Sequence, residues 1–255
     1  MISLGLDCGS SWCKGVVWDS LAPMPLKTVC LPTGWDLPAA VAKVLAVLRE
    51  DLGPAPMAST GYGRALAEGA VLRPTEISCH ARGASMLRPG AATVVDVGGQ
   101  DTKAIAVGDG RALSFQMNDR CAAGTGRFLT MTLDRLGMTL DELDHLETRE
   151  AAPIKSVCAV FAESEMMGLL ASGAPRSAIA LGVLNSLADK AAALAARLGP
   201  GPPVVMTGGL SACRPLAGAL SLALGLEVET LGLGRFAGAL GAAAMAAEKA
   251  GGREA

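Results

Sequence analysis

Apolar and polar residues along this chain alternate in short blocks that indicate a mixed α/β protein. Apolar runs at 2–6 and 14–18 flank a polar segment that begins at Asp7 and contains glycine, a pattern typical of a β-hairpin. The same pattern returns at 93–97 and 104–107, again with an acidic residue at the turn. The recurrence predicts a duplication, with two related α/β lobes of about 100 residues each that face one another.

Longer stretches, in which apolar residues recur every three to four positions, predict helices. These helices are expected at 37–51, 76–87, 178–198 and 236–249, with a strand at 204–206 and a charged helix or loop at 141–150. We place the first lobe at 1–88 and the second at 89–235, and we expect the last segment, 236–255, to be a helix that returns to the first lobe.

The composition fits a packed globular protein that does not bind nucleic acid. Hydrophobic residues make up 51% of the 255 residues, and the net charge is −2 with lysine and arginine scattered along the chain. The N-terminus has no basic segment followed by a long apolar stretch, and the apolar runs are short for a bilayer span. We therefore expect a cytoplasmic protein with no membrane and no nucleic-acid partner.

Three loops that contain glycine, each preceded by a strand, predict a nucleotide site. The loops are 7–11 with Lys14 just beyond, 96–101, and 207–210. Glycine lets backbone N–H groups approach a phosphate closely. The carboxylates of Asp7 and Asp96 suit a hydrated Mg²⁺ ion, and Gln100 or Asp101 could orient the attacking water in phosphoryl transfer.

One such loop by itself would be an ordinary tight turn. The three in this order are similar to the phosphate-1, phosphate-2 and adenosine motifs of the actin/Hsp70/sugar-kinase superfamily. The chain has no G-x-x-x-x-G-K-[ST] loop and no G-x-G-x-x-G after a strand, which disfavours a P-loop NTPase and a Rossmann fold. The expected fold class is therefore α/β: a two-lobed, ribonuclease H-like ATPase fold with duplicated lobes.

Two of the seven cysteines stand before predicted helices. The positive N-terminal ends of these helices favour the thiolates of Cys121 and Cys158 and an anionic ligand such as a sulfide cluster. Two thiolates cannot hold a [4Fe–4S] cluster, which needs four ligands, but a two-fold dimer would supply them. The alternative is that both cysteines are buried packing residues.

Several short strings give the chain a resemblance to a known family. The strings are STGYGR, EISCHARGA, DVGGQDTK, NDRCAAGTGRFL, CAVFAESE and TGGL. The chain resembles the activators of 2-hydroxyacyl-CoA dehydratases, a family that also includes the ATP-binding subunits of benzoyl-CoA reductase. The similarity runs from residue 2 to residue 247, so it covers nearly the whole chain.

The resemblance implies an ATPase that drives low-potential, single-electron transfer. Its cofactors would be ATP or ADP, Mg²⁺, and a [4Fe–4S] cluster shared between two subunits of a homodimer or of a pair with a related subunit. The electron would pass to a dehydratase or reductase component with its own iron–sulfur cluster. A ferredoxin or flavodoxin would reload the protein.

The resemblance also assigns site residues. Cys121 and Cys158 match the cluster ligands, and the other five cysteines match no ligand position. The residues that match the nucleotide motifs are Asp7, Gly9, Ser10, Ser11 and Lys14 in the first loop, Asp96, Gly98, Gly99, Gln100 and Asp101 in the second, and Gly208 and Gly209 in the third. Among these, Asp7, Gln100 and Asp101 are the expected catalytic residues.

The chain departs from the family pattern at two places, and several alternatives stay open. Cys8 stands where the family often has valine, and the segment 21–36 is short and rich in proline. A small-molecule kinase of the same fold without a cluster, a regulator that only binds ATP, and a permanent subunit of a benzoyl-CoA reductase share the nucleotide motifs. His80 is interpreted as a packing or hydrogen-bonded neighbour, and Glu163 and Glu165 are left open as supporting residues.

Overall fold

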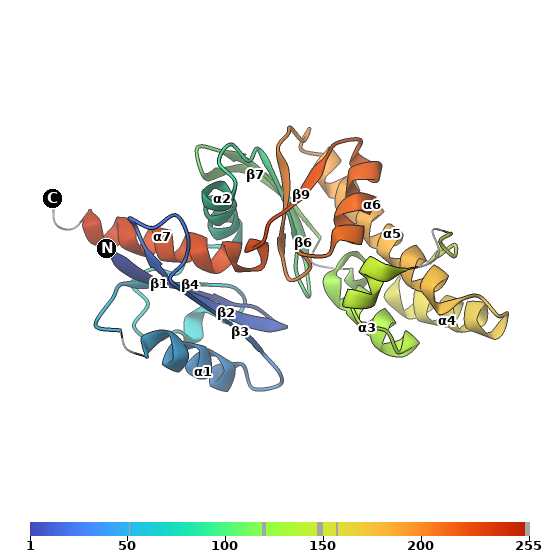
Figure 1. The fold of residues 1–255 in the computed structure, drawn as a ribbon, viewed down its shortest axis with the longest axis horizontal. Coiled ribbons are helices and arrows are strands. Elements are labelled where there is room, and N and C mark those ends of the chain that lie inside the picture. Colours follow the sequence, from blue (N-terminus) through green and yellow to red (C-terminus); the bar gives the residue numbers. More distant parts are fainter. Residues whose placement is uncertain (51, 119–120, 147–149, 157, 253–255) are drawn as a thin grey trace.

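The first of two β-sheets is built from the N-terminal quarter of the chain, and it has the strand order β3-β2-β1-β4 (Figure 1). The computed structural model describes residues 1–50, 52–118, 121–146, 150–156 and 158–252. β1 runs antiparallel to β2 and parallel to β4. The strands are β1 (Ile2–Cys8), β2 (Trp12–Asp19), β3 (Lys27–Pro32) and β4 (Met57–Thr60).

The second sheet repeats this arrangement and adds one strand, with the order β7-β6-β5-β8-β9. β5 runs antiparallel to β6 and parallel to β8, as β1 does with β2 and β4. The strands are β5 (Thr93–Val97), β6 (Thr102–Gly108), β7 (Arg111–Asn118), β8 (Val204–Gly208) and β9 (Val228–Thr230). The predicted pair of hairpins is therefore confirmed, and each hairpin forms the centre of its own sheet.

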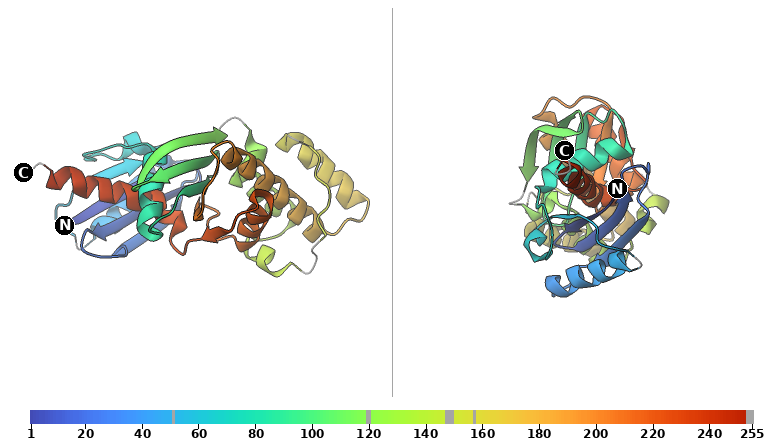
Figure 2. Two further views of the ribbon diagram at one scale, coloured as in Figure 1. Left: turned by 90° about the horizontal axis from the view of Figure 1, so that it is seen from above. Right: turned by 90° about the vertical axis from the view of Figure 1, so that its left-hand side faces the viewer.

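Two helices, α2 (Glu76–Leu87) and α7 (Ala237–Gly251), lie side by side between the sheets (Figures 1 and 2). α2 packs on the strands of the second sheet, and α7 packs on β1, β2 and β4 of the first. The two helix backbones approach so closely that a Cβ atom at Gly83 would lie 1.9 Å from the carbonyl oxygen of Ala237. Glycine at this position lets the chain join both sheets through one tightly packed helix pair.

The remaining helices cover the outer faces. α1 (Leu37–Arg49) packs on the first sheet through the buried side chains of Val41, Val44 and Leu48, and the carboxylate of Asp36 caps its N-terminus by accepting from Ala39 N. On the far side of the second sheet lie α3 (Gly126–Leu136), α4 (Ala159–Ala171), α5 (Arg176–Ala196) and α6 (Arg214–Leu224). Together with this sheet they enclose the largest hydrophobic core of the molecule.

α5 differs from the sequence-based expectation that the apolar runs are short. It is long and apolar enough to cross a membrane, but 67% of its apolar stretch is buried inside the protein. It therefore serves here as a core helix beneath the second sheet.

The predicted helices are confirmed with small shifts at their ends, and parts of some predictions lie outside the described residues. These parts are Asp51, Asp119, Arg120, Val157, 147–149 of the charged segment, and 253–255 at the C-terminus. The helix expected after Cys121 is α3, which begins at Gly126, and a short 3₁₀ helix, η2 (Ala122–Gly124), lies between Cys121 and α3. The lobe boundaries at 88/89 and 235/236 stay a prediction.

Candidate functional site

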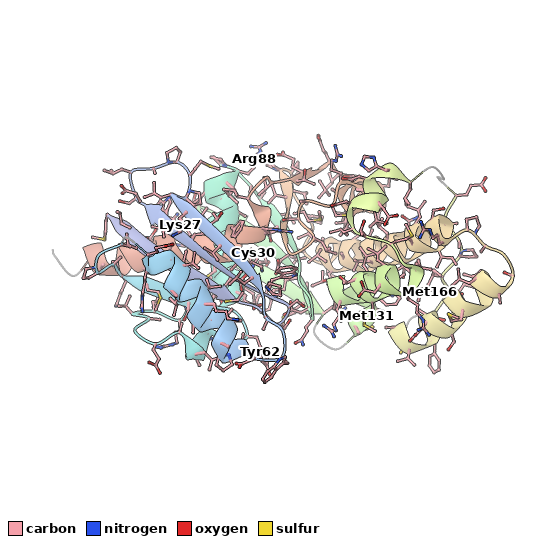
Figure 3. The ribbon with its side chains drawn as sticks, turned by 60° about the horizontal axis from the view of Figure 1, so that its bottom comes forward. Lys27, Cys30, Tyr62, Arg88, Met131 and Met166 are labelled. Atoms are coloured by element: carbon pink, nitrogen blue, oxygen red, sulfur yellow. The ribbon has the colours of Figure 1, made fainter. Side chains whose placement is uncertain are left out.

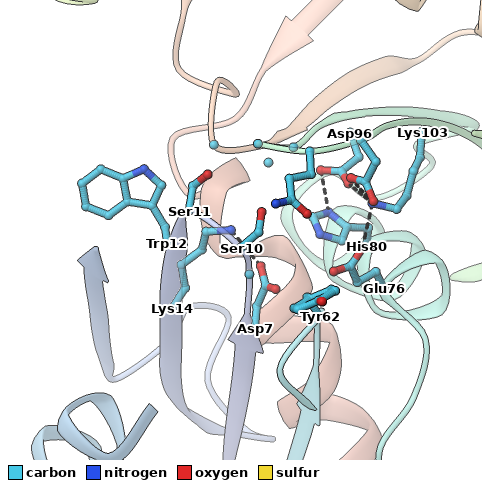
Figure 4. A pocket seen from close by; sticks show the side chains of 18 of the residues that line it. Asp7, Ser10, Ser11, Trp12, Lys14, Tyr62, Glu76, His80, Asp96 and Lys103 are labelled. Carbon is cyan, nitrogen blue, oxygen red and sulfur yellow. Dashed lines mark hydrogen bonds and ion pairs between the residues drawn. The ribbon is translucent and has the colours of Figure 1, made fainter. Parts of the chain in front are cut away.

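All twelve residues predicted for the nucleotide site line a single cavity between the two hairpin turns (Figure 4). The first turn, between β1 and β2, contributes Asp7, Gly9, Ser10, Ser11 and Lys14. The second turn, between β5 and β6, contributes Asp96, Gly98, Gly99, Gln100 and Asp101, and the end of β8 contributes Gly208 and Gly209. Residues separated by up to two hundred positions in the sequence are thus brought together as predicted.

Glycine is required where these loops meet. A Cβ atom at Gly99 would lie 2.2 Å from Ser11 Oγ, so the two hairpin turns face one another without space for a side chain. Gly208 has a φ of +89°, and a Cβ atom there would lie 2.5 Å from Asp96 Oδ1. The third loop therefore lies directly against the carboxylate of Asp96 in the second loop.

Each hairpin pairs a buried aspartate with a buried lysine on the neighbouring strand. Asp7 lies opposite Lys14 in the strand register, and Lys14 Nζ is 2.8 Å from Asp7 Oδ2. Asp96 lies opposite Lys103, and Lys103 Nζ is 3.4 Å from Asp96 Oδ2. The pattern D-x-G-x-x-x-x-K occurs in both hairpins, so the duplication extends to the charged groups. Lys103 was not predicted as a site residue, although this repeated spacing could have identified it.

Lys103 also binds two further carboxylates. Its Nζ atom is 2.6 Å from Asp101 Oδ1 and 2.7 Å from Glu76 Oε2. Burial would lower the pKa of Lys103, but Asp96, Glu76 and Asp101 outweigh burial and hold the pKa well above its usual value. Burial raises the pKa of Glu76, and the charge of Lys103 only partly opposes this. Lys103 is therefore the fixed cation of the second hairpin.

α2 brings two more ionisable residues into the cavity that the sequence analysis did not assign to it. Glu76 and His80 are four positions apart, which places them on one face of the helix, and both line the cavity. His80 is only 3% exposed, and its Nδ1 atom is 2.9 Å from Thr207 Oγ1 and 3.4 Å from Asp96 Oδ1. His80 is a hydrogen-bonded neighbour, as expected, but its neighbours are nucleotide-site residues.

Acidic and basic side chains line the cavity in equal number when His80 is counted with the lysines and the arginine. Four are carboxylates and three are cations, and both lysines are already paired with carboxylates. The third cation, Arg64, makes no ion pair within the described part of the chain. The four carboxylates are Asp7, Glu76, Asp96 and Asp101. Carboxylates are ligands of the kind that Mg²⁺ prefers in proteins.

The two predicted cluster ligands lie outside this cavity. Cys121 is half-buried at the start of η2, and Cys158 is exposed at the N-terminal end of α4. The residues that follow them, Ala122 and Ala159, line one groove between α3 and α4. Met131 and Met166 line the same groove. In Figure 3 they lie on the opposite side of the molecule from the first sheet, whose strand β3 carries Cys30.

Hydrogen bonds connect the second hairpin turn to the segment after Cys121. The amide of Gly126 donates to the carbonyl of Gly98 at 2.9 Å, and the amide of Arg127 donates to the carbonyl of Gly99 at 3.3 Å. The hydroxyl of Thr102 donates to the carbonyl of Gly124 at 2.6 Å. The start of α3 is therefore bonded directly to a loop that lines the nucleotide cavity.

Glu163 and Glu165 lie on α4 and do not line the nucleotide cavity. Glu165 accepts hydrogen bonds from the amides of Lys155 and Ser156, at 2.9 Å each, and these bonds lower its pKa. It thereby holds the segment that leads to Cys158. Glu163 pairs with Arg135 of α3 at 3.5 Å, which joins the two walls of the groove.

Two sheets that share one arrangement of four strands, with a glycine-lined cavity between their hairpin turns, define a two-lobed ATPase fold of the actin and sugar-kinase class. A solved ROK family glucokinase from Streptomyces griseus, in complex with glucose and AMPPNP, shares this fold with a TM-score of 0.62 at 15% identity, over 97% of this chain and 100% of that chain. The predicted fold class is confirmed.

The family model described as the BadF/BadG/BcrA/BcrD ATPase family matches residues 4–246, and the chain belongs to this family. The chain is 41% identical to the (R)-2-hydroxyglutaryl-CoA dehydratase activating ATPase of Acidaminococcus fermentans over 256 residues, or 97% of this chain and 98% of that protein. The solved activator of the 2-hydroxyisocaproyl-CoA dehydratase from Clostridium difficile, with bound ADPNP, has a TM-score of 0.91 at 33% identity and covers 100% of this chain and 97% of that chain. The predicted family and the predicted ATPase class are confirmed.

Proposed function

We propose that this protein is an ATP-dependent electron donor that activates a 2-hydroxyacyl-CoA dehydratase or a related acyl-CoA reductase. Similarity over nearly the full length to proteins named as dehydratase activators supports the activator role. In this proposal the nucleotide cavity supplies the driving force, and the surface that carries Cys121 and Cys158 supplies the electron.

The observation that carries the proposal is the hydrogen-bonded connection between these two regions. Gly98 belongs to the turn at the cavity and Thr102 begins β6, and both are bonded to the segment that runs from Cys121 into α3. A movement of this turn on nucleotide binding or hydrolysis would therefore be transmitted to Cys121 through short, direct bonds. A kinase that used only the cavity would not require this connection.

We assign the cavity residues to ATP and Mg²⁺. Asp7 and Asp96, one from each hairpin, would hold the Mg²⁺ ion together with phosphate oxygens and water. The backbone of the turns, with Ser10, Ser11 and Lys14, would bind phosphates, and Gly208 and Gly209 would face the adenosine. Gln100 and Asp101 would orient the attacking water.

We assign Cys121 and Cys158 to a [4Fe–4S] cluster at the surface between two subunits. Among the described residues, no group of three or more His, Cys, Asp or Glu side chains could hold a metal ion. One chain offers two thiols beside the groove, so four thiolate ligands require a second copy or a related subunit. The cluster would supply single electrons at low potential.

The partners follow from this assignment. The acceptor would be a dehydratase or reductase component with its own iron–sulfur cluster, and a ferredoxin or flavodoxin would return an electron to this protein. With such partners the protein would act in the cytoplasm. A cluster-free kinase, one alternative, would contain no iron. A permanent benzoyl-CoA reductase subunit, the other alternative, would stay bound to its partner, whereas an activator would dissociate from it.

Anaerobic purification of wild-type protein and cysteine variants tests the cluster assignment. Cys121→Ser and Cys158→Ser are expected to lose iron, sulfide and the cluster signal in electron paramagnetic resonance, while they still bind ATP. Cys30→Ser is the matched control, because Cys30 is half-buried like Cys121 but lies on β3. Full iron content in either ligand variant, or an iron-free wild type, would refute the electron-donor proposal.

The nucleotide assignment is tested on the same samples. Asp7→Ala is expected to reduce the rate of ATP hydrolysis by roughly 100-fold or more, because a charged group that stabilises the transition state is removed. Asp19→Ala, on the exposed end of the same hairpin, is the control. Unchanged hydrolysis in Asp7→Ala would remove Asp7 from the site.

A further inference from the structure

His80 reaches from the helix between the sheets to the carboxylate of Asp96. Its Nδ1 atom lies 2.9 Å from Thr207 Oγ1 and 3.4 Å from Asp96 Oδ1. The three side chains come from α2, β8 and β5, and each is at most 3% exposed. The polar edge of the imidazole is therefore directed at a nucleotide-site carboxylate rather than at solvent (Figure 4).

The network defines which atom donates at each step. The hydroxyl of Thr207 has one proton, and it donates to Asp96 Oδ1 at 3.3 Å. Since the same hydroxyl oxygen contacts His80 Nδ1, this nitrogen must carry a proton and donate to it. The result is a chain from His80 Nδ1–H to the Thr207 hydroxyl and on to Asp96 Oδ1.

The other edge of the imidazole lies beside the first hairpin. A Cβ atom at Gly238 of α7 would lie 2.8 Å from His80 Nε2 and 3.2 Å from Asp7 Oδ2. His80 therefore occupies the space between the two aspartates, one from each sheet. Glycine at position 238 leaves room for this arrangement, since any side chain would displace the imidazole or Asp7.

We propose that His80 and Thr207 are positioning residues, which hold the carboxylate of Asp96 in the orientation that binds the nucleotide-bound divalent cation. This inference rests on the proposed role of Asp96 in the nucleotide site. Asp96 Oδ1 is held by the chain from His80, and Asp96 Oδ2 faces Lys103 at 3.4 Å. Without the chain, Lys103 is the remaining charged partner and draws the carboxylate toward β6, away from the cation.

Paired variants test this proposal. Thr207→Val removes the hydroxyl and keeps the side-chain shape, whereas Thr207→Ser keeps the hydroxyl. His80→Gln carries its amide near the Nε2 position and loses the Nδ1 donor, whereas His80→Asn carries an amide N–H near the Nδ1 position. Thr207→Ser and His80→Asn are thus the matched controls for the loss of one hydrogen bond.

The measurement is the binding of ADPNP at increasing Mg²⁺ concentration, and again in the presence of EDTA. Thr207→Val and His80→Gln are expected to raise the Mg²⁺ concentration at half-saturation roughly 10- to 100-fold. The affinity measured in EDTA should stay at the wild-type value, which a general loss of structure would not allow. The double variant should resemble each single variant, because both act through one chain.

Two outcomes overturn the proposal, and they can be distinguished with Asp96→Asn. If Asp96→Asn raises the Mg²⁺ requirement but Thr207→Val and His80→Gln do not, the positioning role is wrong and the proposed nucleotide site stands. If Asp96→Asn also leaves the requirement unchanged, the role of Asp96 in the proposed function fails, and the positioning role fails with it.

Discussion

Two buried lysines balance the carboxylates that face the nucleotide cavity. Burial alone would lower the pKa of Lys14 and of Lys103, yet both pKa values are raised, because Asp7 acts on the first and Asp96, Glu76 and Asp101 on the second. Removal of either lysine would leave buried carboxylates without a partner, a change that costs about 3–5 kcal/mol. The same residues that shape the site are therefore needed for the fold.

Asp96 makes stability depend on pH in a defined direction. Burial raises its pKa, but His80, Lys103 and Lys14 outweigh burial and hold it below the usual value. The charged carboxylate therefore stabilises the fold above its unfolded pKa of about 3.9, and this contribution is lost as the pH falls through the lower folded pKa. We expect the free energy of unfolding to fall more between about pH 6 and about pH 3 in wild-type protein than in Asp96→Asn.

Urea unfolding at these two pH values measures the difference. Asp141→Asn is the control, because Asp141 lies exposed on the 3₁₀ helix η3 (Asp141–His145) and should keep the wild-type pH dependence. An equal loss of unfolding free energy in wild type and Asp96→Asn would contradict the predicted role of the buried carboxylate.

At the scale of single elements, the turn after β8 offers two adjacent glycines with opposite surroundings. Gly208 has a φ of +89° and directly faces Asp96 Oδ1, whereas a Cβ atom at Gly209 would meet nothing within 4 Å. Gly208→Ala is expected to lower stability by about 1–3 kcal/mol through backbone strain and to weaken nucleotide binding by displacing Asp96. Gly209→Ala should keep the wild-type stability, because its added Cβ atom would meet no protein atom.

Titration with ADPNP and urea unfolding of both variants provide the comparison. Wild-type ADPNP affinity in Gly208→Ala would mean that the close approach of Gly208 to Asp96 has no part in nucleotide binding, and equal stability of the two variants would contradict the predicted strain at Gly208.

Local sequence signals predicted the central hairpins but not the strands at the sheet edges. β1, β2, β5 and β6 are apolar runs joined in pairs by short turns that contain glycine, which is a local signal for a hairpin. In β7 most side chains are at least half exposed, and β9 has only three residues, so neither presents a clear apolar pattern. These strands form because the neighbouring strand offers free hydrogen-bonding groups, which no local pattern reveals.

The candidate nucleotide site was predictable where motifs carry it and missed where tertiary packing supplies it. Glycine and acidic residues in three loops identified all twelve predicted cavity residues. Glu76 was predicted only as part of a helix and His80 only as a packing or hydrogen-bonded neighbour, because nothing in the sequence says which helix face meets the cavity. Lys103 was visible in the repeated spacing of seven residues from Asp96, a signal that becomes meaningful once the strand register is known.

At the scale of the whole molecule, both sheets line the cavity, and the second sheet also contacts the segment that follows Cys121. The first sheet lines the cavity with the end of β1, the turn after it, the start of β2 and the segment after β4, and α7 packs behind it. The second sheet lines the cavity near the turn between β5 and β6. Hydrogen bonds join this turn and the start of β6 to the segment that follows Cys121. Motion between the sheets would therefore reach Cys121 through the hydrogen bonds that the second hairpin makes with the segment after it.

This arrangement predicts that the hydroxyl of Thr102 transmits the nucleotide state to Cys121. In cluster-free protein, ADPNP is expected to change the rate at which iodoacetamide alkylates Cys121, as followed by mass spectrometry of the modified peptide. Thr102→Val removes the 2.6 Å bond to the carbonyl of Gly124 and should reduce this nucleotide effect by about 2- to 30-fold, which corresponds to a coupling of 0.5–2 kcal/mol. The affinity for ADPNP should change little, since Thr102 does not line the cavity.

The chain contains a matched control for this experiment. Thr93 also donates its hydroxyl to a glycine carbonyl, that of Gly201 at 2.9 Å, but at the opposite end of β5. Thr93→Val removes an equivalent bond without touching the cysteine segment, so it should leave the nucleotide effect at Cys121 intact, as should Thr102→Ser. A full nucleotide effect in Thr102→Val, or an equal loss in Thr93→Val, would show that the coupling does not run through the start of α3 but is spread over the whole second sheet.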